Sequence, residues 1–411
     1  MTPGAPRGGP RGGPGGGVSR ILLALPSVGL GGTERHSAVL AAALAAAGVA
    51  VTVALAPPLA AGFAAMLETP GGTGGRAEGR AAVRLQPAPL AWRPDASAGG
   101  GIEAAIRAQA AALAPVLAAV RPDLVLLPLP WPDHGLGLFQ AVIEAGLPAL
   151  AIHHLAPREP EPPLPAAALS VTARLAAAPL RFAAVSAPVA ARAAARLGLP
   201  AARFAVVPNG VPVPPEDPAL RAAARARLRG RLGLPPGARL LLFAGRLEWE
   251  KGADLLPGIA ARLRTACDAT LVALGDGSLR ETLRRSPAAR EAALRLPGHV
   301  ADAPDWMLAA DALLLPSRLE GCPLVFLEAA ARRCPVIASG DAMEGFGEEA
   351  DRLAAIAPNG GITDLTALCA VRLNNHMISC ACVESAYRLA LATDQAAMLR
   401  RYASLIRAAF A

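Results

Sequence analysis

The segment Leu240-Leu-Leu-Phe-Ala-Gly-Arg-Leu-Glu-Trp-Glu-Lys-Gly252 joins a short apolar run to a loop with two glycines and the single lysine of a chain with 40 basic residues. Such an apolar run is typical of a buried parallel strand. Arg binds an anion as a planar fork, whereas Lys is a compact point charge, so Arg246 and Lys251 can hold a diphosphate from two directions. The segment therefore predicts an α/β sheet in which this strand ends at an anion-binding loop.

Short apolar runs alternate with Ala-rich stretches from residue 18 onward, a pattern typical of parallel strands joined by helical crossovers. The predicted strands of the first series are residues 18–25, 49–55, 124–127, 149–152, 182–185 and 204–207, and those of the second series are residues 240–244, 270–274, 294–296, 312–315 and 336–338. The pattern predicts two Rossmann-like, doubly wound domains that face each other across a cleft. A ligand then binds where the carboxyl ends of the two sets of strands meet.

The composition changes along the chain mark the predicted domain boundaries. The Gly, Pro and Arg repeats of residues 1–17 bury too little apolar surface to offset the entropy of ordering, and we expect a disordered tail. Residues 18–207 form the predicted first domain. A linker that is rich in proline and then in Arg and Ala covers residues 208–236, and residues 237–394 form the predicted second domain.

The net charge of +8 suits phosphorylated ligands or an anionic membrane surface. We expect no nucleic-acid partner, because the arginines are dispersed and no zinc-finger spacing or stacking-aromatic motif accompanies them. The six cysteines have no spacing typical of a disulfide framework or a zinc site, which indicates a reducing, cytoplasmic compartment. No charge occurs between Arg35 and Glu68, but Gly48, Pro57 and Pro58 divide this stretch into a helix, a strand and a loop and argue against a membrane span.

A second glycine loop, Gly29-Leu-Gly-Gly-Thr-Glu-Arg-His36, follows the first predicted strand and opens an Ala-rich helix. Glycines let the backbone approach an anion, and the helix start adds amide donors. The loop does not match a dinucleotide fingerprint, because Glu34 occupies the third glycine position and no acidic residue follows about 20 residues later. A glycine loop that serves only tight packing remains the alternative.

Two carboxylates stand eight residues apart in Arg318-Leu-Glu-Gly-Cys-Pro-Leu-Val-Phe-Leu-Glu328. Glu320 lies in the predicted loop after the strand at 312–315, and Glu328 lies inside the following helix within an apolar run. An unpaired buried carboxylate is costly, so a bound pair of hydroxyl groups is a suitable partner for Glu328. The alternative is a pair of solvated surface residues.

Together these motifs resemble the retaining glycosyltransferases of the GT-B group, family 4 (glycosyltransferase group 1). The resemblance rests on the order of the glycine loop, Pro208-Asn-Gly-Val211, Gly245-Arg-Leu with Lys251-Gly, Gly275-Asp-Gly277 and the pair of glutamates. It covers roughly residues 18–345. It implies the GT-B fold, a nucleotide-sugar donor that is a UDP-, GDP- or ADP-sugar, and an acceptor hydroxyl.

The resemblance also implies roles for individual residues. Arg246 and Lys251 would clamp the donor diphosphate and stabilise the charge that grows on it as the sugar leaves. Glu320 would face the donor sugar as a third catalytic residue, and Glu328 would accept the ribose hydroxyls. Further donor-binding positions implied in this way are Gly31, Gly32, Asn209, Gly275, Gly277, Val300, Gly321, Leu324 and Val325. The stretch 395–411 would complete the first domain.

His153 ends an apolar strand, as does the histidine of a His-Asp pair that contacts the donor sugar in many relatives, and it is the fourth predicted catalytic residue. Here His154 replaces the aspartate, so one structural and one exposed histidine is the alternative. No Asp-x-Asp motif occurs, so no metal ion and no other cofactor is expected. The expected acceptor is a carbohydrate or a lipid-linked glycan, and the basic charge allows peripheral contact with the anionic inner face of a membrane.

Two other functions stay open at this point. A sugar-nucleotide epimerase of the same fold would bind the same diphosphate without an acceptor, and a non-catalytic relative would bind the donor without turnover. A pyridoxal-phosphate phosphorylase would need a Schiff-base lysine, and Lys251 is already assigned to phosphate. The segment Asp341-Ala-Met-Glu-Gly-Phe-Gly-Glu348 and residues 359–386 depart from the family pattern.

Overall fold

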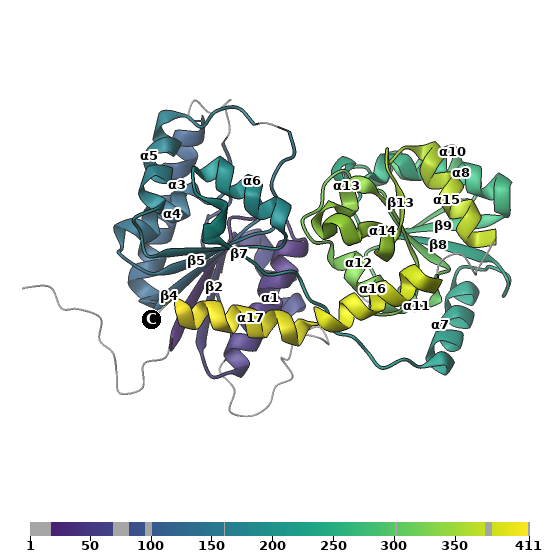
Figure 1. Ribbon diagram of the computed structural model, residues 1–411, viewed down its shortest axis with the longest axis horizontal. Coiled ribbons are helices and arrows are strands. Elements are labelled where there is room, and N and C mark those ends of the chain that lie inside the picture. Colours follow the sequence, from purple (N-terminus) through teal and green to yellow (C-terminus); the bar gives the residue numbers. More distant parts are fainter. Residues whose placement is uncertain are drawn as a thin grey trace, which may run out of the picture.

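The computed structural model describes residues 18–68, 82–94, 101–159, 161–300, 302–374 and 380–409, and the predicted tail of residues 1–17 lies outside this part. Two α/β domains lie side by side, each built on its own sheet (Figure 1). The prediction of an α/β chain with two doubly wound domains is confirmed.

The first domain contains a seven-stranded sheet in the order β3-β2-β1-β4-β5-β6-β7, with parallel pairing throughout. Its strands are β1 (Arg20–Ala24), β2 (Ala50–Leu55), β3 (Arg84–Pro87), β4 (Leu124–Leu129), β5 (Ala149–His153), β6 (Leu180–Ala184) and β7 (Phe204–Val206). Its helices are α1 (Gly32–Ala46), η1 (Pro57–Leu59), α2 (Ala60–Glu68), α3 (Gly101–Val120), α4 (Leu136–Glu144), α5 (Ala166–Leu175), α6 (Ala187–Leu197) and η2 (Ala201–Arg203).

Alternate side chains of β1 enter two different cores, as the period of two in a strand requires. Ile21 and Leu23 pack with α1 in one core, whereas Leu22 and Ala24 pack with helices α3 to α6 in the other. Apolar side chains therefore cover both faces of the sheet, and the loop after β1 opens at its carboxyl edge. Helix α3 is long and apolar enough to cross a bilayer, but its inner side is buried in the second of these cores.

The second domain contains a six-stranded parallel sheet in the order β10-β9-β8-β11-β12-β13. Its strands are β8 (Arg239–Ala244), β9 (Ala269–Leu274), β10 (Leu294–Gly298), β11 (Ala312–Leu315), β12 (Val336–Ser339) and β13 (Ala355–Ala357). Its helices are η3 (Trp249–Lys251), η4 (Ala253–Leu255), α8 (Leu256–Cys267), α9 (Arg280–Arg284), α10 (Pro287–Arg290), α11 (Ala303–Ala309), α12 (Leu324–Ala330), α13 (Gly340–Met343), η5 (Glu344–Glu349), α14 (Ala350–Leu353), α15 (Ile362–Asn374) and α16 (Cys380–Ala392).

Helix α7 (Pro218–Arg231) lies within the predicted linker of residues 208–236 but packs on the second domain. Arg229 is buried, and its guanidinium donates to Asp311 Oδ2 at 2.9 Å and to the carbonyl oxygen of Ala309 at 3.1 Å. Burial lowers the pKa of Arg229, an effect that the Asp311 carboxylate opposes. Because a buried charge needs such partners, this network fixes α7 to the sheet of the second domain.

The last helix, α17 (Gln395–Ala408), returns to the first domain beneath its sheet (Figure 1). Met398, Tyr402 and Ile406 are buried in the same core as Ile21 and Leu23. The chain passes between the domains twice, near Val211 and near Gln395. These two segments lie side by side, since the Gln395 amide donates to the Val211 carbonyl oxygen at 3.1 Å. The end of the chain therefore completes the core that α1 covers.

Candidate functional site

The glycine loop of the first domain is held by a buried carboxylate. The Gly31 amide donates to Glu34 Oε2 at 2.6 Å, and the Ser27 hydroxyl donates to Glu34 Oε1. Burial raises the pKa of Glu34, while the Ser27 hydrogen bond and the nearby charge of Arg246 lower it. Glu34 thus fixes the loop at the start of α1, a role that the sequence analysis missed. A glutamate three residues into a helix is a signal for such a contact.

Arg246 of the second domain approaches this loop. A Cβ placed on Gly31 would lie 3.9 Å from Arg246 Nε, and one placed on Gly32 would lie 3.7 Å from Leu324 Cδ1. Arg246 is exposed and makes no ion pair with the residues that the structure describes. The two predicted anion-binding loops therefore meet at the junction of the domains, where the guanidinium of Arg246 lies against the glycine loop of the first domain.

Lys251 and Glu320, both predicted as catalytic, pair with each other. Lys251 Nζ lies 2.7 Å from Glu320 Oε1, which also accepts from the Ser317 hydroxyl at 2.8 Å. Gly252 permits this approach, because it has a φ of 70° and a Cβ there would lie 2.2 Å from the Pro316 carbonyl oxygen. The loop after β8 thereby lies directly against the loop after β11.

Glu328 of α12 is buried and forms an ion pair with Arg35 of α1, across the domain junction. The side chain of Arg35 is 48% exposed, whereas that of Glu328 is 9% exposed. Leu324 and Val325, at the start of α12, are half-buried beside it. The predicted buried carboxylate is confirmed, but its present partner is an arginine that the sequence analysis did not assign.

Several predicted donor-binding glycines have packing roles. Gly275 has a φ of 127°, and a Cβ there would lie 1.9 Å from the Gly245 carbonyl oxygen. A Cβ on Gly277 would lie 2.6 Å from the Leu247 carbonyl oxygen. The Gly275–Gly277 loop thus supports the loop that carries Arg246 and Lys251. Val300 follows β10 and is half-buried against the core.

Asn209 ties the linker to the second domain. Its Nδ2 donates to the Cys322 carbonyl oxygen at 2.7 Å, and the residue is 5% exposed. Next to Cys322, Gly321 lies so close to the first domain that a Cβ would stand 2.0 Å from the His154 carbonyl oxygen. Asn209 and Gly321 are therefore both at the domain junction, with Asn209 already engaged by backbone.

His153, the last residue of β5, and His154, which follows it, are both buried, so the alternative with one exposed histidine is wrong. The ring of His153 packs against Phe182 and Phe204, with centroids 6.4 and 5.4 Å away, so it points into the core. Burial lowers the pKa of His153 to about 3 and that of His36 to about 4. In this structure His153 is a neutral core histidine, and the ring of His154 lies 4.7 Å from that of His36.

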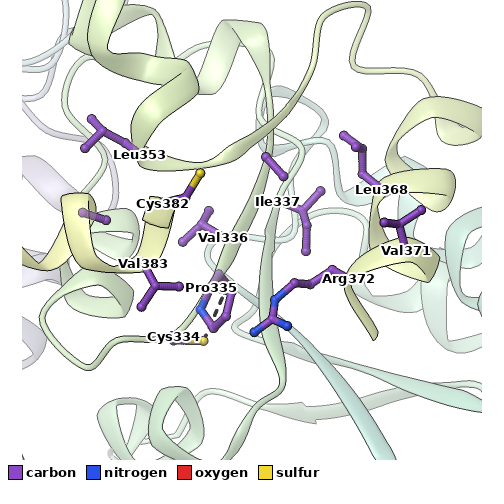
Figure 2. A pocket seen from close by; sticks show the side chains of 12 residues that line it. Cys334, Pro335, Val336, Ile337, Leu353, Leu368, Val371, Arg372, Cys382 and Val383 are labelled. Atoms are coloured by element: carbon purple, nitrogen blue, oxygen red, sulfur yellow. Dashed lines mark hydrogen bonds between the residues drawn. The ribbon is translucent and has the colours of Figure 1, made fainter. Parts of the chain in front are cut away.

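No group of three or more His, Cys, Asp or Glu residues that could hold a metal ion occurs in the described part of the chain. A cavity of about 70 Å³ lies elsewhere in the second domain, between β12, α14, α15 and α16 (Figure 2). Its lining is mainly apolar and includes Val336, Leu353 and Val383, with Arg372 at one side. None of the predicted site residues lines this cavity.

The comparisons with known proteins agree with this geometry. Residues 30–213 match the family described as Glycosyltransferase Family 4, and residues 238–373 match the family described as Glycosyl transferases group 1. The chain thus contains one region that matches each of these two glycosyltransferase families. The first match includes Gly31 and Arg35, and the second includes Arg246 and Glu328, their partners across the domain junction.

A curated relative, the teichuronic acid biosynthesis glycosyltransferase TuaC of Bacillus subtilis, is 38% identical over 99 residues. The match spans about a quarter of each protein, 24% of this chain and 24% of the relative.

Solved structures with the same GT-B fold include HepE of Anabaena in complex with UDP, which has a TM-score of 0.69 and 19% identity, with 95% of this chain and 100% of that chain covered. WaaG, a glycosyltransferase involved in lipopolysaccharide biosynthesis, has a TM-score of 0.66 and 18% identity, with 95% and 99% covered.

Proposed function

We propose that the chain is a retaining glycosyltransferase that moves a sugar from a nucleoside-diphosphate donor to an acceptor hydroxyl. The observation that carries the proposal is the meeting of Gly31 with Arg246 across the domain junction, beside the pair of Lys251 with Glu320. Two cations and a glycine loop suit a diphosphate, and two carboxylates at the junction suit hydroxyl groups. HepE, which has the same fold, was crystallised with UDP and with UDP-glucose, which supports a nucleotide-sugar donor.

In this proposal the chain's own charges do the electrostatic work. Arg246 and Lys251 stabilise the negative charge that develops on the leaving diphosphate, and no metal ion is required. Glu320, released from Lys251, then faces the donor sugar, and Glu328, released from Arg35, accepts the ribose hydroxyls. The acceptor oxygen bonds to the anomeric carbon on the face from which the diphosphate leaves, so the configuration is retained. The leaving phosphate takes the proton of the acceptor hydroxyl.

The proposed acceptor is a growing surface polysaccharide, a lipopolysaccharide or a glycolipid. TuaC is named for teichuronic acid biosynthesis and WaaG for lipopolysaccharide biosynthesis, which supports this class. We further propose that the chain works in the cytoplasm, at the inner face of the membrane. The described cysteines Cys267, Cys322, Cys334, Cys369 and Cys382 are free thiols, in keeping with a reducing compartment.

The test is thermal unfolding of the full chain in the presence of UDP-, GDP- and ADP-sugars or NAD, without added metal. A ligand present at about 100 times its Kd stabilises the native state by about 2.7 kcal/mol, which raises the midpoint by several degrees. A response to one class of nucleotide sugar supports the proposal and identifies the donor base. A response to NAD alone contradicts it.

Product analysis then separates the alternatives. Incubation with the identified donor and lipid-linked or oligosaccharide acceptors should give a product whose anomeric configuration, measured by NMR, equals that of the donor. An altered nucleotide sugar formed without an acceptor would identify an epimerase. Tight donor binding without turnover on any acceptor, and without slow hydrolysis, would identify a non-catalytic relative.

A further inference from the structure

The acidic segment after β12, which departs from the family pattern, reaches across to the first domain. Asp341 of α13 forms an ion pair with Arg158, from the loop after β5. Glu344, the first residue of η5, pairs through Oε1 with Arg192 of α6, and Arg158 Nε lies 3.7 Å from the same oxygen. One glutamate oxygen is thus shared by two arginines of the other domain.

These charges are partly shielded from solvent. The side chains of Glu344 and Arg192 are 24% and 25% exposed, and those of Asp341 and Arg158 are 41% and 40% exposed. A single exposed ion pair contributes little, but a network whose central pair is three-quarters buried is screened less by salt. Breaking it by charge reversal would place like charges next to each other at the junction.

The residue after Glu344 connects this network to the proposed donor-sugar loop. A Cβ on Gly345 would lie 2.2 Å from the Gly321 carbonyl oxygen and 3.3 Å from Ser186 Cβ. Gly321 in turn lies against the His154 carbonyl oxygen. The backbones of Gly345, Gly321 and the first domain are therefore stacked in direct contact, and a shift of η5 must move Gly321.

The segment itself is firmly attached to the second domain. The Ser339 hydroxyl donates to the Ser317 carbonyl at 2.5 Å and accepts from the Ala342 amide at 3.2 Å, which caps α13. The rings of Phe346 and Phe326 lie 4.8 Å apart. Since Ser317 also binds Glu320, the segment is linked to the proposed site by side chains as well as by backbone.

We propose that Arg158, Arg192 and Glu344 are positioning residues. They form an ionic clamp between the domains that holds η5, and through Gly345 holds Gly321, in the place required by the donor sugar. The role at the donor sugar rests on the proposed function, whereas the clamp itself does not. The clamp should act on binding of the sugar moiety and should leave contacts to the diphosphate, which are made by Arg246 and Lys251, unchanged.

The first experiment measures hydrogen exchange in the ligand-free full chain. Arg192→Glu and Glu344→Arg should each speed exchange of the backbone amides in 321–324 and 340–349 by about 10-fold, because each brings like charges together. The double variant Arg192→Glu/Glu344→Arg restores an opposite pair between these two positions but leaves an arginine at 344 beside Arg158, so exchange should return only part of the way to the wild type. Arg107→Glu, which breaks an ion pair inside α3, is the matched control and should leave these amides unchanged.

The second experiment measures the Kd of the nucleotide sugar found in the thermal panel and of its nucleoside diphosphate. In each single variant the Kd of the nucleotide sugar should rise by about 10-fold, whereas the Kd of the nucleoside diphosphate should stay unchanged. The double variant should recover part of the lost affinity, since Arg158 still faces the arginine at position 344. Glu344→Gln provides a milder variant should a reversal fail to fold. Wild-type exchange in both single variants, or no recovery in the double variant, overturns the clamp. If exchange rises in the single variants and falls again in the double variant, but the protein binds no nucleotide, the clamp is supported and the proposed function is contradicted.

Discussion

Replacing Lys251 with methionine removes the charge of the predicted phosphate clamp and keeps most of the apolar stem. In the ligand-free structure Lys251 Nζ lies 2.7 Å from Glu320 Oε1, with the two side chains 20% and 10% exposed. At an effective dielectric constant of about 20, two unit charges about 4 Å apart interact by about 4 kcal/mol. A leaving diphosphate gains up to one charge, so turnover should fall by about 10²–10³-fold, or about 2.7–4 kcal/mol.

The assay is release of nucleoside diphosphate from the identified donor under steady-state conditions, with kcat and KM determined separately. The loss should fall mainly on kcat, because the lost interaction strengthens as the sugar leaves. The fold should survive, since Glu320 keeps its hydrogen bond from Ser317. Arg284→Ala, which removes an exposed ion pair within α9, is the control and should leave turnover unchanged. A folded Lys251→Met protein with wild-type kcat would refute the clamp.

Three further predictions concern stability. Burial lowers the pKa of His36 from 6.5 to about 4, so below pH 6.5 the imidazole is protonated in the unfolded chain but not in the folded chain. The free energy of unfolding should therefore fall by about 3 kcal/mol for this residue as the pH drops to 4. His153, whose pKa burial also lowers, adds to this effect, so His153→Phe should weaken the pH dependence of the urea midpoint. If the midpoint stays constant from pH 7 to 4.5, buried neutral histidines are ruled out. Asp311→Ala leaves the guanidinium of Arg229 buried without its carboxylate partner, so the free energy of unfolding in urea should fall by about 3–5 kcal/mol. A fall of less than about 1 kcal/mol would contradict the network that fixes α7. The buried Tyr402 hydroxyl has no hydrogen-bond partner within the described residues, so Tyr402→Phe should leave stability unchanged or raise it slightly. Tyr402→Ala should lower the free energy of unfolding by about 3–5 kcal/mol, because it opens a cavity under α17. Equal effects of the two variants would contradict this packing.

Each strand predicted from an apolar run overlaps an observed strand, because central parallel strands are buried on both faces and need such runs. The pattern does not predict β3 or β13. Strand β3 is an edge strand with mostly exposed residues, and β13 has only three residues. Strand β3, Arg84-Leu-Gln-Pro87, contains one aliphatic residue, and the Ala-Ile-Ala of β13 is not distinguishable from the Ala-rich helices of this chain, so composition gives no signal for either strand.

The chemistry of the site was predictable in part. Burial of Glu328 follows from its apolar neighbours in sequence, whereas its pairing with Arg35 depends on how the domains meet. The hydrogen bond from Asn209 to Cys322 also depends on how the domains meet, and the local sequence does not predict it. The position of His153 could have been predicted from the strand period of two, which places it on the same face of β5 as Ala149 and Ala151, in the core.

The most direct test of the account is a crystal structure of the full chain with the nucleoside diphosphate of the donor that the thermal panel identifies, grown without divalent metal. We predict that phosphate oxygens lie within hydrogen-bond distance of Arg246 and Lys251 and that the Lys251–Glu320 pair is broken. Glu328 should contact the ribose hydroxyls in place of Arg35. A diphosphate bound elsewhere, or one that leaves both ion pairs intact, would contradict the account.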